Sequence, residues 1–307
     1  MDVRKQLAKT GRAALRIGLL VVLFGPIAAA GTNVFRVHRV PQGDPRSYAP
    51  PLAFEDLELE TADGLRLAAW YIPAPVKKPK GAVLVCHGVG ANREDVLPKA
   101  QFLAPAGYSC LLFEFRNHGK SQGRRCSLGM RETLDLRAGL SALERKAPGL
   151  PVGIFAQSMG AATAILAAAD TPRVAAYVLD SPFASLWEMA RENFRHVPDL
   201  LGVPLQYAVS FWGSLMVGGS IFDISPEQHV QELAPRPVLF IHGEKDALIP
   251  YEHSIRLHAA YRGSKQLWLV PDAWHVAAHM KHGQEYARRV LDHFDRAMAG
   301  ADEGQRP

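Results

Sequence analysis

One serine lies among small residues in the stretch "VGIFAQSMGAATAI", residues 152–165. Its centre, "AQSMG", differs at one position from Gly-x-Ser-x-Gly, which holds a nucleophilic serine on a sharp turn between a strand and a helix. Ser158 follows a β-rich run and begins an alanine-rich helical stretch. Small residues are needed two positions before and after the serine, because strand and helix crowd there. Ala156 is the smallest step up from glycine and Gly160 is retained, so the pattern predicts a nucleophile if one methyl group fits.

Two further polar side chains follow predicted strands later in the chain. Asp246 lies in "FIHGEKDALIP" and His275 in "LVPDAWH". An imidazole can remove the serine proton, and a carboxylate can fix the imidazole tautomer and stabilise its charged form. We therefore predict a catalytic triad of Ser158, Asp246 and His275. Asp180, in "LDSPF" after another strand, is the alternative acid.

The loop "CHGVGANRED" follows the predicted strand at residues 82–86. Its glycines allow a tight turn, so that a backbone N–H can point at a carbonyl oxygen that becomes negative in the transition state. We predict an oxyanion hole formed by the backbone N–H groups of Val89 and Met159. His87 is interpreted as a structural residue that holds this loop.

Other kinds of site are less well supported by the sequence. The spacing of His275, His279 and His282 is compatible with zinc ligands on one helical face, but no His-Glu-x-x-His motif is present. We predict no metal site and no organic cofactor, since nothing resembles a dinucleotide or phosphate-loop fingerprint. The chain has three cysteines, Cys86, Cys110 and Cys126, which indicate buried apolar positions rather than a disulfide framework.

Short β-rich runs alternate with helical stretches from about residue 52, which predicts a mostly parallel sheet covered on both faces. A hairpin is expected to turn at Asp63–Gly64. Buried strands are predicted at residues 82–86, 109–115, 152–156, 175–180, 237–243 and 266–270. Helices are predicted at residues 130–146, 254–261 and 285–298.

More than fifty residues separate Asp180 from Pro237, too many for an ordinary connection. This insertion is rich in Trp, Phe, Leu and Met. We predict a helical cap at about residues 183–234, over the carboxyl ends of the strands. Most of its aromatic residues are expected to pack the cap onto the core, and some to face the substrate.

The N-terminal region differs from the rest of the 307-residue chain. Of the net charge of +5, five basic residues and one acidic residue within 1–16 contribute +4, which leaves +1 for the remainder and indicates no nucleic-acid surface. Residues 17–35 are uncharged and would span about 28 Å as a helix, close to the thickness of a bilayer core. A proline-rich linker, residues 36–51, precedes the predicted domain at 52–299 and a tail at 300–307.

We interpret residues 17–35 as a membrane anchor, with a signal segment cleaved near "AAAG" at 28–31 as the alternative. The basic cluster before the span predicts a cytoplasmic N-terminus and a catalytic domain on the outer side of the membrane. Arg36, Arg39 and Arg46 beyond the span weaken this orientation.

With these motifs, the chain resembles the α/β-hydrolase superfamily, in particular its serine aminopeptidase-like and monoacylglycerol-lipase-like branch and related membrane-anchored bacterial hydrolases. The resemblance covers about residues 52–298. It rests on "HGVGANRED", "FEFRNHGKSQG", "AQSMGAA", "LDSPFASL", "HGEKDALIP" and "DAWH". The chain departs from the family pattern at Ala156, and at Glu114 and Asn117, where the family usually has Asp and Gly.

The resemblance and the triad together imply a serine hydrolase that cleaves esters, or less readily amides, through an acyl-enzyme on Ser158. Cap aromatics indicate a small-molecule ester or lipid-like substrate with an apolar group. Acyl transfer on the same triad is the alternative within enzymes, and a catalytically silent binding protein is the alternative outside them. The oligomeric state does not follow from the sequence.

The anchor interpretation predicts how the protein fractionates. Full-length protein should sediment with membranes and resist extraction by high salt, because about 19 apolar residues insert into a bilayer rather than adsorb to it. A protein that starts near Pro41 should be soluble. Recovery of the mature chain in the soluble fraction, without residues 1–30 by N-terminal sequencing, would instead establish a cleaved signal.

Overall fold

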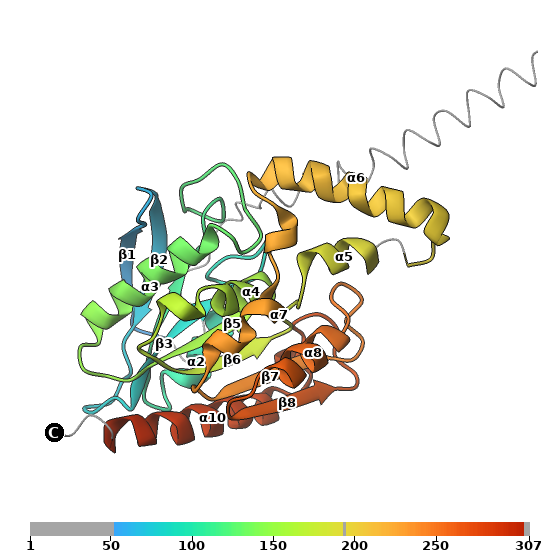
Figure 1. The fold of residues 1–307 in the computed structure, drawn as a ribbon. Coiled ribbons are helices and arrows are strands. Elements are labelled where there is room, and N and C mark those ends of the chain that lie inside the picture. Colours follow the sequence, from blue (N-terminus) through green and yellow to red (C-terminus); the bar gives the residue numbers. More distant parts are fainter. Residues whose placement is uncertain (1–51, 193–194, 304–307) are drawn as a thin grey trace, which may run out of the picture.

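An eight-stranded sheet forms the centre of the domain (Figure 1). The computed structural model describes residues 52–192 and 195–303. The strands are β1 (Glu55–Glu60), β2 (Arg66–Ile72), β3 (Gly81–Cys86), β4 (Tyr108–Phe113), β5 (Val152–Gln157), β6 (Val174–Asp180), β7 (Val238–Gly243) and β8 (Lys265–Val270). They lie in the order β1-β2-β4-β3-β5-β6-β7-β8. The pairs β1–β2 and β2–β4 are antiparallel and the other neighbours are parallel, so the expected mostly parallel sheet is confirmed.

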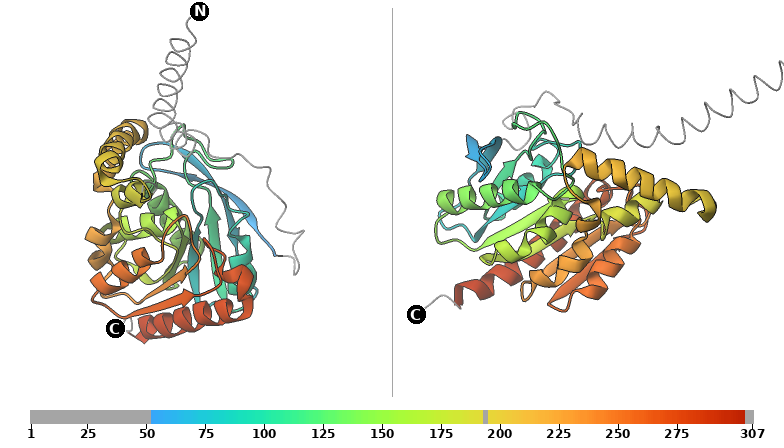
Figure 2. Two further views of the ribbon diagram at one scale, coloured as in Figure 1. Left: turned by 90° about the vertical axis from the view of Figure 1, so that its right-hand side faces the viewer. Right: turned by 45° about the horizontal axis from the view of Figure 1, so that its top comes forward.

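Helices cover both faces of this sheet (Figures 1 and 2). One face packs against α3 (Glu132–Lys146), α4 (Met159–Leu166) and α8 (Glu252–Ala260). The other packs against α2 (Leu97–Leu103) and α10 (Gly283–Glu303). Each residue of β3, β4, β5 and β7 is buried, which is why these strands read as continuous apolar runs rather than alternating ones.

The predicted strands and helices are present, with ends that differ by at most five residues. The hairpin turns at Gly64, whose φ of +79° favours glycine. The strand predicted at 109–115 ends at Phe113 instead. The Glu114 N–H still donates to the Ala68 carbonyl of β2, but the Phe115 N–H leaves the sheet and donates to the His87 ring. The short helix α2 was not predicted, since seven residues are too few for a clear periodic pattern.

A helical cap follows the sixth strand, as the sequence predicted (Figure 1). It contains α5 (Leu186–Glu192), α6 (Asp199–Val217), the 3₁₀ turn η3 (Ile221–Asp223), α7 (Pro226–His229) and η4 (Val230–Leu233). Phe183 and Ile224 at the base of the cap pack against Ala162 of α4 and against Ile249. The cap is therefore joined to the helix that follows Ser158.

Among the described residues, α6 is the one helix with the length and composition to cross a membrane, with a mean hydropathy of 1.4 in its most apolar window. The predicted anchor at 17–35 and its flanking segments, 1–16 and 36–51, lie outside the described residues. The anchor thus stays a prediction.

Candidate active site

Ser158 occupies the sharp turn between β5 and α4. Its φ of 53° and ψ of −121° are unusual for a residue with a side chain. Its N–H donates to the Asp180 carbonyl at 2.8 Å, and its carbonyl accepts from the Ala162 N–H at 3.1 Å. These bonds hold the turn from the neighbouring strand and from the helix. The strained conformation is that of a nucleophile elbow.

Different contacts explain the small residues two positions before and two positions after Ser158. A Cβ at Gly160 would lie 2.6 Å from the His87 carbonyl oxygen, a backbone contact that cannot relax cheaply, so glycine is required there. Ala156, by contrast, points its methyl group into the core cluster and is fully buried. The departure from the family pattern at Ala156 is therefore accommodated, and the fold provides room for the extra methyl group.

The structure brings Ser158, His275 and Asp246 together, although they lie far apart in the sequence. His275 Nε2 is 2.9 Å from Ser158 Oγ, and His275 Nδ1 is 2.6 Å from Asp246 Oδ2. Because a carboxylate only accepts, Nδ1 carries the proton and Nε2 is left to accept from the serine hydroxyl. This tautomer suits an imidazole that acts as a base toward Ser158.

The Asp246 carboxylate is fixed on both oxygens. Oδ1 accepts from the backbone N–H groups of Leu248 and Ile249, each at 2.9 Å. Oδ2 faces His275 and, at 3.3 Å, His242 Nε2. Burial alone would raise the pKa of Asp246, but the hydrogen bonds from His242 and His275 outweigh burial and hold this pKa well below its ordinary range. Asp246 is therefore an anion at neutral pH.

His242 is a residue of this site that the sequence analysis missed. It is fully buried on β7, with Nε2 at 2.9 Å from the Ile249 carbonyl and Nδ1 at 2.6 Å from Ser254 Oγ. The carbonyl can only accept, so Nε2 carries a proton that also faces Asp246. His242 precedes Asp246 by four residues in "FIHGEKD". This spacing alone does not predict a contact, because the two side chains meet only when the loop after β7 is folded.

Asp180, the alternative acid, has other partners. Its buried carboxylate accepts from Gln157 Nε2 at 3.1 Å, Ser181 Oγ at 3.1 Å and Tyr286 Oη at 2.7 Å. His275 binds Asp246 instead. The geometry therefore places Asp180 beneath the elbow, where its backbone carbonyl also receives the Ser158 N–H.

The loop predicted to form the oxyanion hole lies against the serine. A Cβ at Gly88 would be 3.0 Å from Ser158 Cβ, a contact so tight that the loop or the serine would have to shift to accept it. Val89 follows Gly88 directly. Met159 is the first residue of α4, a position whose N–H has no partner within its own helix. Both N–H groups thus belong to segments that meet at Ser158.

Two buried histidines hold this loop in place. His87 Nε2 accepts from the Phe115 N–H at 3.1 Å, and His118 Nε2 accepts from the Gly90 N–H at 3.2 Å. Burial lowers the pKa of His87 well below its usual value, which keeps the ring neutral and able to accept. The interpretation of His87 as a structural residue agrees with these contacts.

Glu114 and Asn117, where the chain departs from the family pattern, lie in the segment after β4 that packs beside this loop. Asn117 has a φ of 63°, a left-handed conformation that asparagine tolerates better than most residues. Glu114 is buried, accepts from the Lys120 N–H at 2.6 Å and lies 3.7 Å from Arg93. These contacts tie the segment after β4 together without reaching the triad.

The histidines of the zinc alternative have separate partners. His275 contacts Ser158 and Asp246, His282 Nε2 lies 2.7 Å from Asp272, and the His279 ring packs on Tyr286. In residues 52–192 and 195–303, no group of three or more His, Cys, Asp or Glu side chains is placed to hold a metal ion. The three cysteines are buried and unbridged, with Cys126 Sγ 3.3 Å from Met159 Sδ.

Comparison with known proteins identifies the family. The family model described as serine aminopeptidase, S33, matches residues 77–233. The chain belongs to this family. It is therefore an α/β hydrolase, in agreement with its sheet order, its helical layers and the position of its cap.

Similar proteins support the same assignment. YqkD of Bacillus subtilis is 31% identical, covering 79% of this chain and 81% of its own, and YfhR of Escherichia coli K12 is 27% identical, covering 81% and 84%. Both are uncharacterized proteins. A solved structure, the esterase Pf2001 of Pyrococcus furiosus, is 26% identical with a TM-score of 0.69, and the match covers 84% of this chain and 97% of the esterase.

The lowered pKa of Asp246 predicts how stability depends on pH. A carboxyl with a lower pKa in the folded state contributes stability above its unfolded value of about 3.9, and this contribution is lost as the pH falls through the folded value. Wild type should therefore exceed Asp246→Asn in free energy of unfolding at about pH 7, and the difference should shrink below about pH 4.

Urea unfolding curves at the two pH values test this expectation. Asp292→Asn, which changes an exposed carboxyl on α10, is the matched control and should show a difference near zero at both. A difference for Asp246→Asn that grows on acidification would contradict the predicted sign.

Proposed function

We propose that this protein is a serine esterase that hydrolyses carboxylic esters with an apolar acyl or alkyl group. One observation carries the proposal: an unbroken hydrogen-bonded chain runs from Ser158 Oγ through His275 to the ionised Asp246. Among the residues named in the site, Ser158 is the one hydroxyl that His275 contacts. The esterase activity named for the similar Pyrococcus furiosus protein supports esters over amides.

Acylation begins when Ser158 Oγ attacks the ester carbonyl carbon. His275 Nε2 takes the hydroxyl proton as the new C–O bond forms, and Asp246 stabilises the resulting imidazolium. The carbonyl oxygen becomes negative and accepts hydrogen bonds from the Val89 and Met159 N–H groups. When the tetrahedral intermediate collapses, the C–O bond to the alcohol breaks and His275 gives its proton to the departing oxygen.

Deacylation repeats these steps with water as the nucleophile. His275 removes a proton from water, the hydroxide oxygen bonds to the acyl carbon, and the proton then returns to Ser158 Oγ as the acid leaves. Nothing in this cycle needs a metal or an organic cofactor, since the imidazole moves each proton.

The acyl group is assigned to the apolar side chains where the cap meets α4. Ala162 lies one helical turn after Ser158 and packs with Phe183, Ile224 and Ile249. Leu186, Met189 and Met130 are partly buried against the same cluster. Their proximity to the elbow, and their lack of charge, suit a hydrocarbon chain rather than a polar one.

The triad assignment predicts a set of kinetic results. Ser158→Ala should abolish both turnover and labelling by a fluorophosphonate, and His275→Ala should cost nearly as much. Their double variant should be little worse than either single one, because the residues act as a unit. Asp246→Asn should lower kcat by about 10⁴, since it favours the wrong imidazole tautomer.

Asp180→Asn is the matched control for the acid, because it makes the same change on a carboxylate that does not contact His275. Its effect on kcat should be much milder. The kinetics are compared after circular dichroism shows that each variant is folded. Collapse of kcat in Asp180→Asn with near-normal Asp246→Asn would transfer the acid role, and ester turnover by Ser158→Ala would refute the mechanism.

The position of the acyl group predicts chain-length dependence. With soluble esters from acetyl to octanoyl, kcat/KM should rise over the first few methylenes by at most about 0.8 kcal/mol each, roughly fourfold. Met189→Ser should flatten this series, because it places a hydroxyl in the apolar cluster. Ile255→Ser, on the exposed side of α8, is the control and should leave the slope unchanged. A flat series in the wild type would remove the cap from acyl recognition.

A further inference from the structure

Helix α6 of the cap forms the outermost edge of the domain, at the opposite side from α10 (Figures 1 and 2). Its outward face is apolar. Large hydrophobic side chains are exposed there, among them Leu200 at 86%, Phe211 at 59% and Leu215 at 56%. The others on this face are Leu201, Val203, Tyr207 and Trp212. An exposed apolar surface of this extent on one helix marks a site of association.

The inward face of α6 is the more polar one. Gly202, Gln206 and Ser210 are buried, together with Leu205 and Val217. Gln206 Nε2 donates to the Trp187 carbonyl at 3.2 Å, while Ser210 Oγ has no hydrogen-bond partner in the described part of the chain. A surface helix in water normally turns its apolar face to the core and its polar face outward. The reversal in α6 indicates that its outer surroundings are apolar.

The composition of the outward face favours the surface of a bilayer. Asp199, at the first position, is the one charged residue in α6. Trp212 and Tyr207 combine an apolar ring with one polar group, which is the pattern of side chains at the boundary between lipid tails and headgroups. Leucine and phenylalanine beside them supply area that would leave water on insertion.

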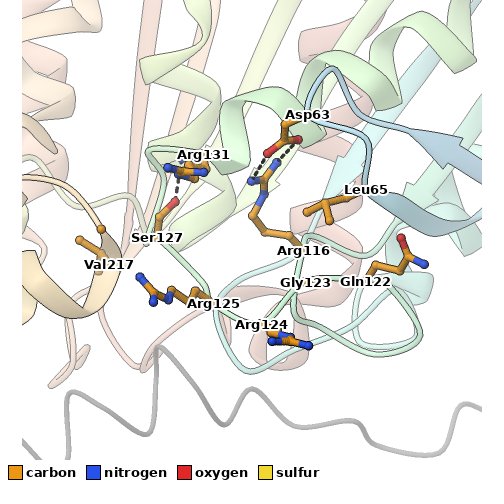
Figure 3. Close-up of a pocket in the computed structure, with 11 residues that line it drawn as sticks. Asp63, Leu65, Arg116, Gln122, Gly123, Arg124, Arg125, Ser127, Arg131 and Val217 are labelled. Atoms are coloured by element: carbon orange, nitrogen blue, oxygen red, sulfur yellow. Dashed lines mark hydrogen bonds and ion pairs between the residues drawn. The ribbon is translucent and has the colours of Figure 1, made fainter.

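Positive charge lies at the C-terminal end of the same helix. A hollow of about 520 Å³ is lined by Val217 and Gly218 of the cap and by Arg124, Arg125 and Arg131 of the loop before α3 (Figure 3). All three arginines are exposed. A fourth arginine in the hollow, Arg116, is neutralised by Asp63 and Asp135. An apolar helix ending beside exposed arginines is complementary to a membrane with anionic headgroups.

We propose that the outward face of α6 lies on an anionic lipid bilayer, with Arg124, Arg125 and Arg131 at the headgroups. The sequence of the N-terminal region supports a bilayer as the partner of this face. The linker at 36–51 reaches at most about 56 Å when extended, so an anchor at 17–35 would confine the whole domain to the neighbourhood of the bilayer and raise the effective concentration of lipid around α6. The proposal concerns binding and does not depend on the chemistry at Ser158.

The contacts of α6 indicate that it lies along the membrane rather than through it. Its inner face is held by the Gln206–Trp187 hydrogen bond, and at the edge of its outward face the Tyr207 ring packs on Trp187 of α5 at a centroid distance of 4.9 Å. At the C-terminal end of α6, Val217 and the following Ile221 pack with Leu128 of the domain. Docked in this way, the cap would be the part of the enzyme nearest to the lipid, above the apolar cluster assigned to the acyl group.

The test uses full-length protein in vesicles and a fluorophore on one introduced cysteine. The native cysteines are buried, so Phe211→Cys and, as the control on the far side, Arg288→Cys can be labelled selectively with nitrobenzoxadiazole. Vesicles contain phosphatidylcholine and phosphatidylglycerol, with nitroxide-labelled acyl chains as quenchers. We expect quenching at position 211 to exceed that at position 288 by about threefold or more, because only α6 meets the acyl chains.

The arginines are tested in the same vesicles. Omitting phosphatidylglycerol, or introducing Arg124→Glu with Arg131→Glu, should at least halve the excess quenching at position 211. Equal quenching at positions 211 and 288 would overturn the proposal. Self-quenching at position 211 that follows protein density, without nitroxide quenching, would instead identify this face as an interface between two copies of the chain. Fluorophosphonate labelling of the same samples reports on Ser158 separately, so failure of docking and failure of the proposed esterase function are distinguishable.

Discussion

Ser158 has a φ of 53°, a backbone conformation that costs about 1–3 kcal/mol for a residue with a side chain and persists only where the surroundings enforce it. The surroundings here are the ends of three neighbouring strands. The Asp180 carbonyl at the end of β6 receives the Ser158 N–H, the loop after β3 passes at Gly88, and α4 leaves at Gly160. A Cβ at Gly88 would lie 3.0 Å from Ser158 Cβ, and one at Gly160 would lie 2.6 Å from the His87 carbonyl oxygen, so both positions are crowded.

The same crowding explains the polar residues beneath the site. Strands that end together leave backbone groups without ladder partners, and buried groups must find others. His87 accepts the Phe115 N–H, His118 accepts the Gly90 N–H, and Asp246 accepts two N–H groups of its own loop. These bonds rigidify the loops that carry the reactive groups. The neutral, buried histidines thus support the site, while one partly exposed histidine, His275, faces the serine.

The cap and the sheet differ in which side chains they bury. In the sheet and its helical layers, most large apolar side chains are buried and most buried polar ones have hydrogen-bond partners. On α6 the order is reversed, with a serine and a glutamine inside and leucine, phenylalanine and tryptophan outside. The inner side of α6 packs against α5 and η3. Its exposed apolar side suits the proposed contact with lipid. The predicted anchor and the proposed lipid contact of the cap would together bring the enzyme to the phase in which an apolar ester dissolves.

Strand ends, turn residues and their order were readable from the sequence because they depend on local chemistry. The alternation of β-rich and helical runs predicted the sheet, and "AQSMG", "HGVG", "EKD" and "DAWH" each marked a strand end with a reactive or flexible residue. The tertiary structure decided which of these ends meet. It placed Asp246 rather than Asp180 on His275, added His242 behind Asp246, and assigned Ala156 to the core. It also decided which side of α6 faces outward, since an apolar helix has no inside until the rest of the chain packs against one of its faces.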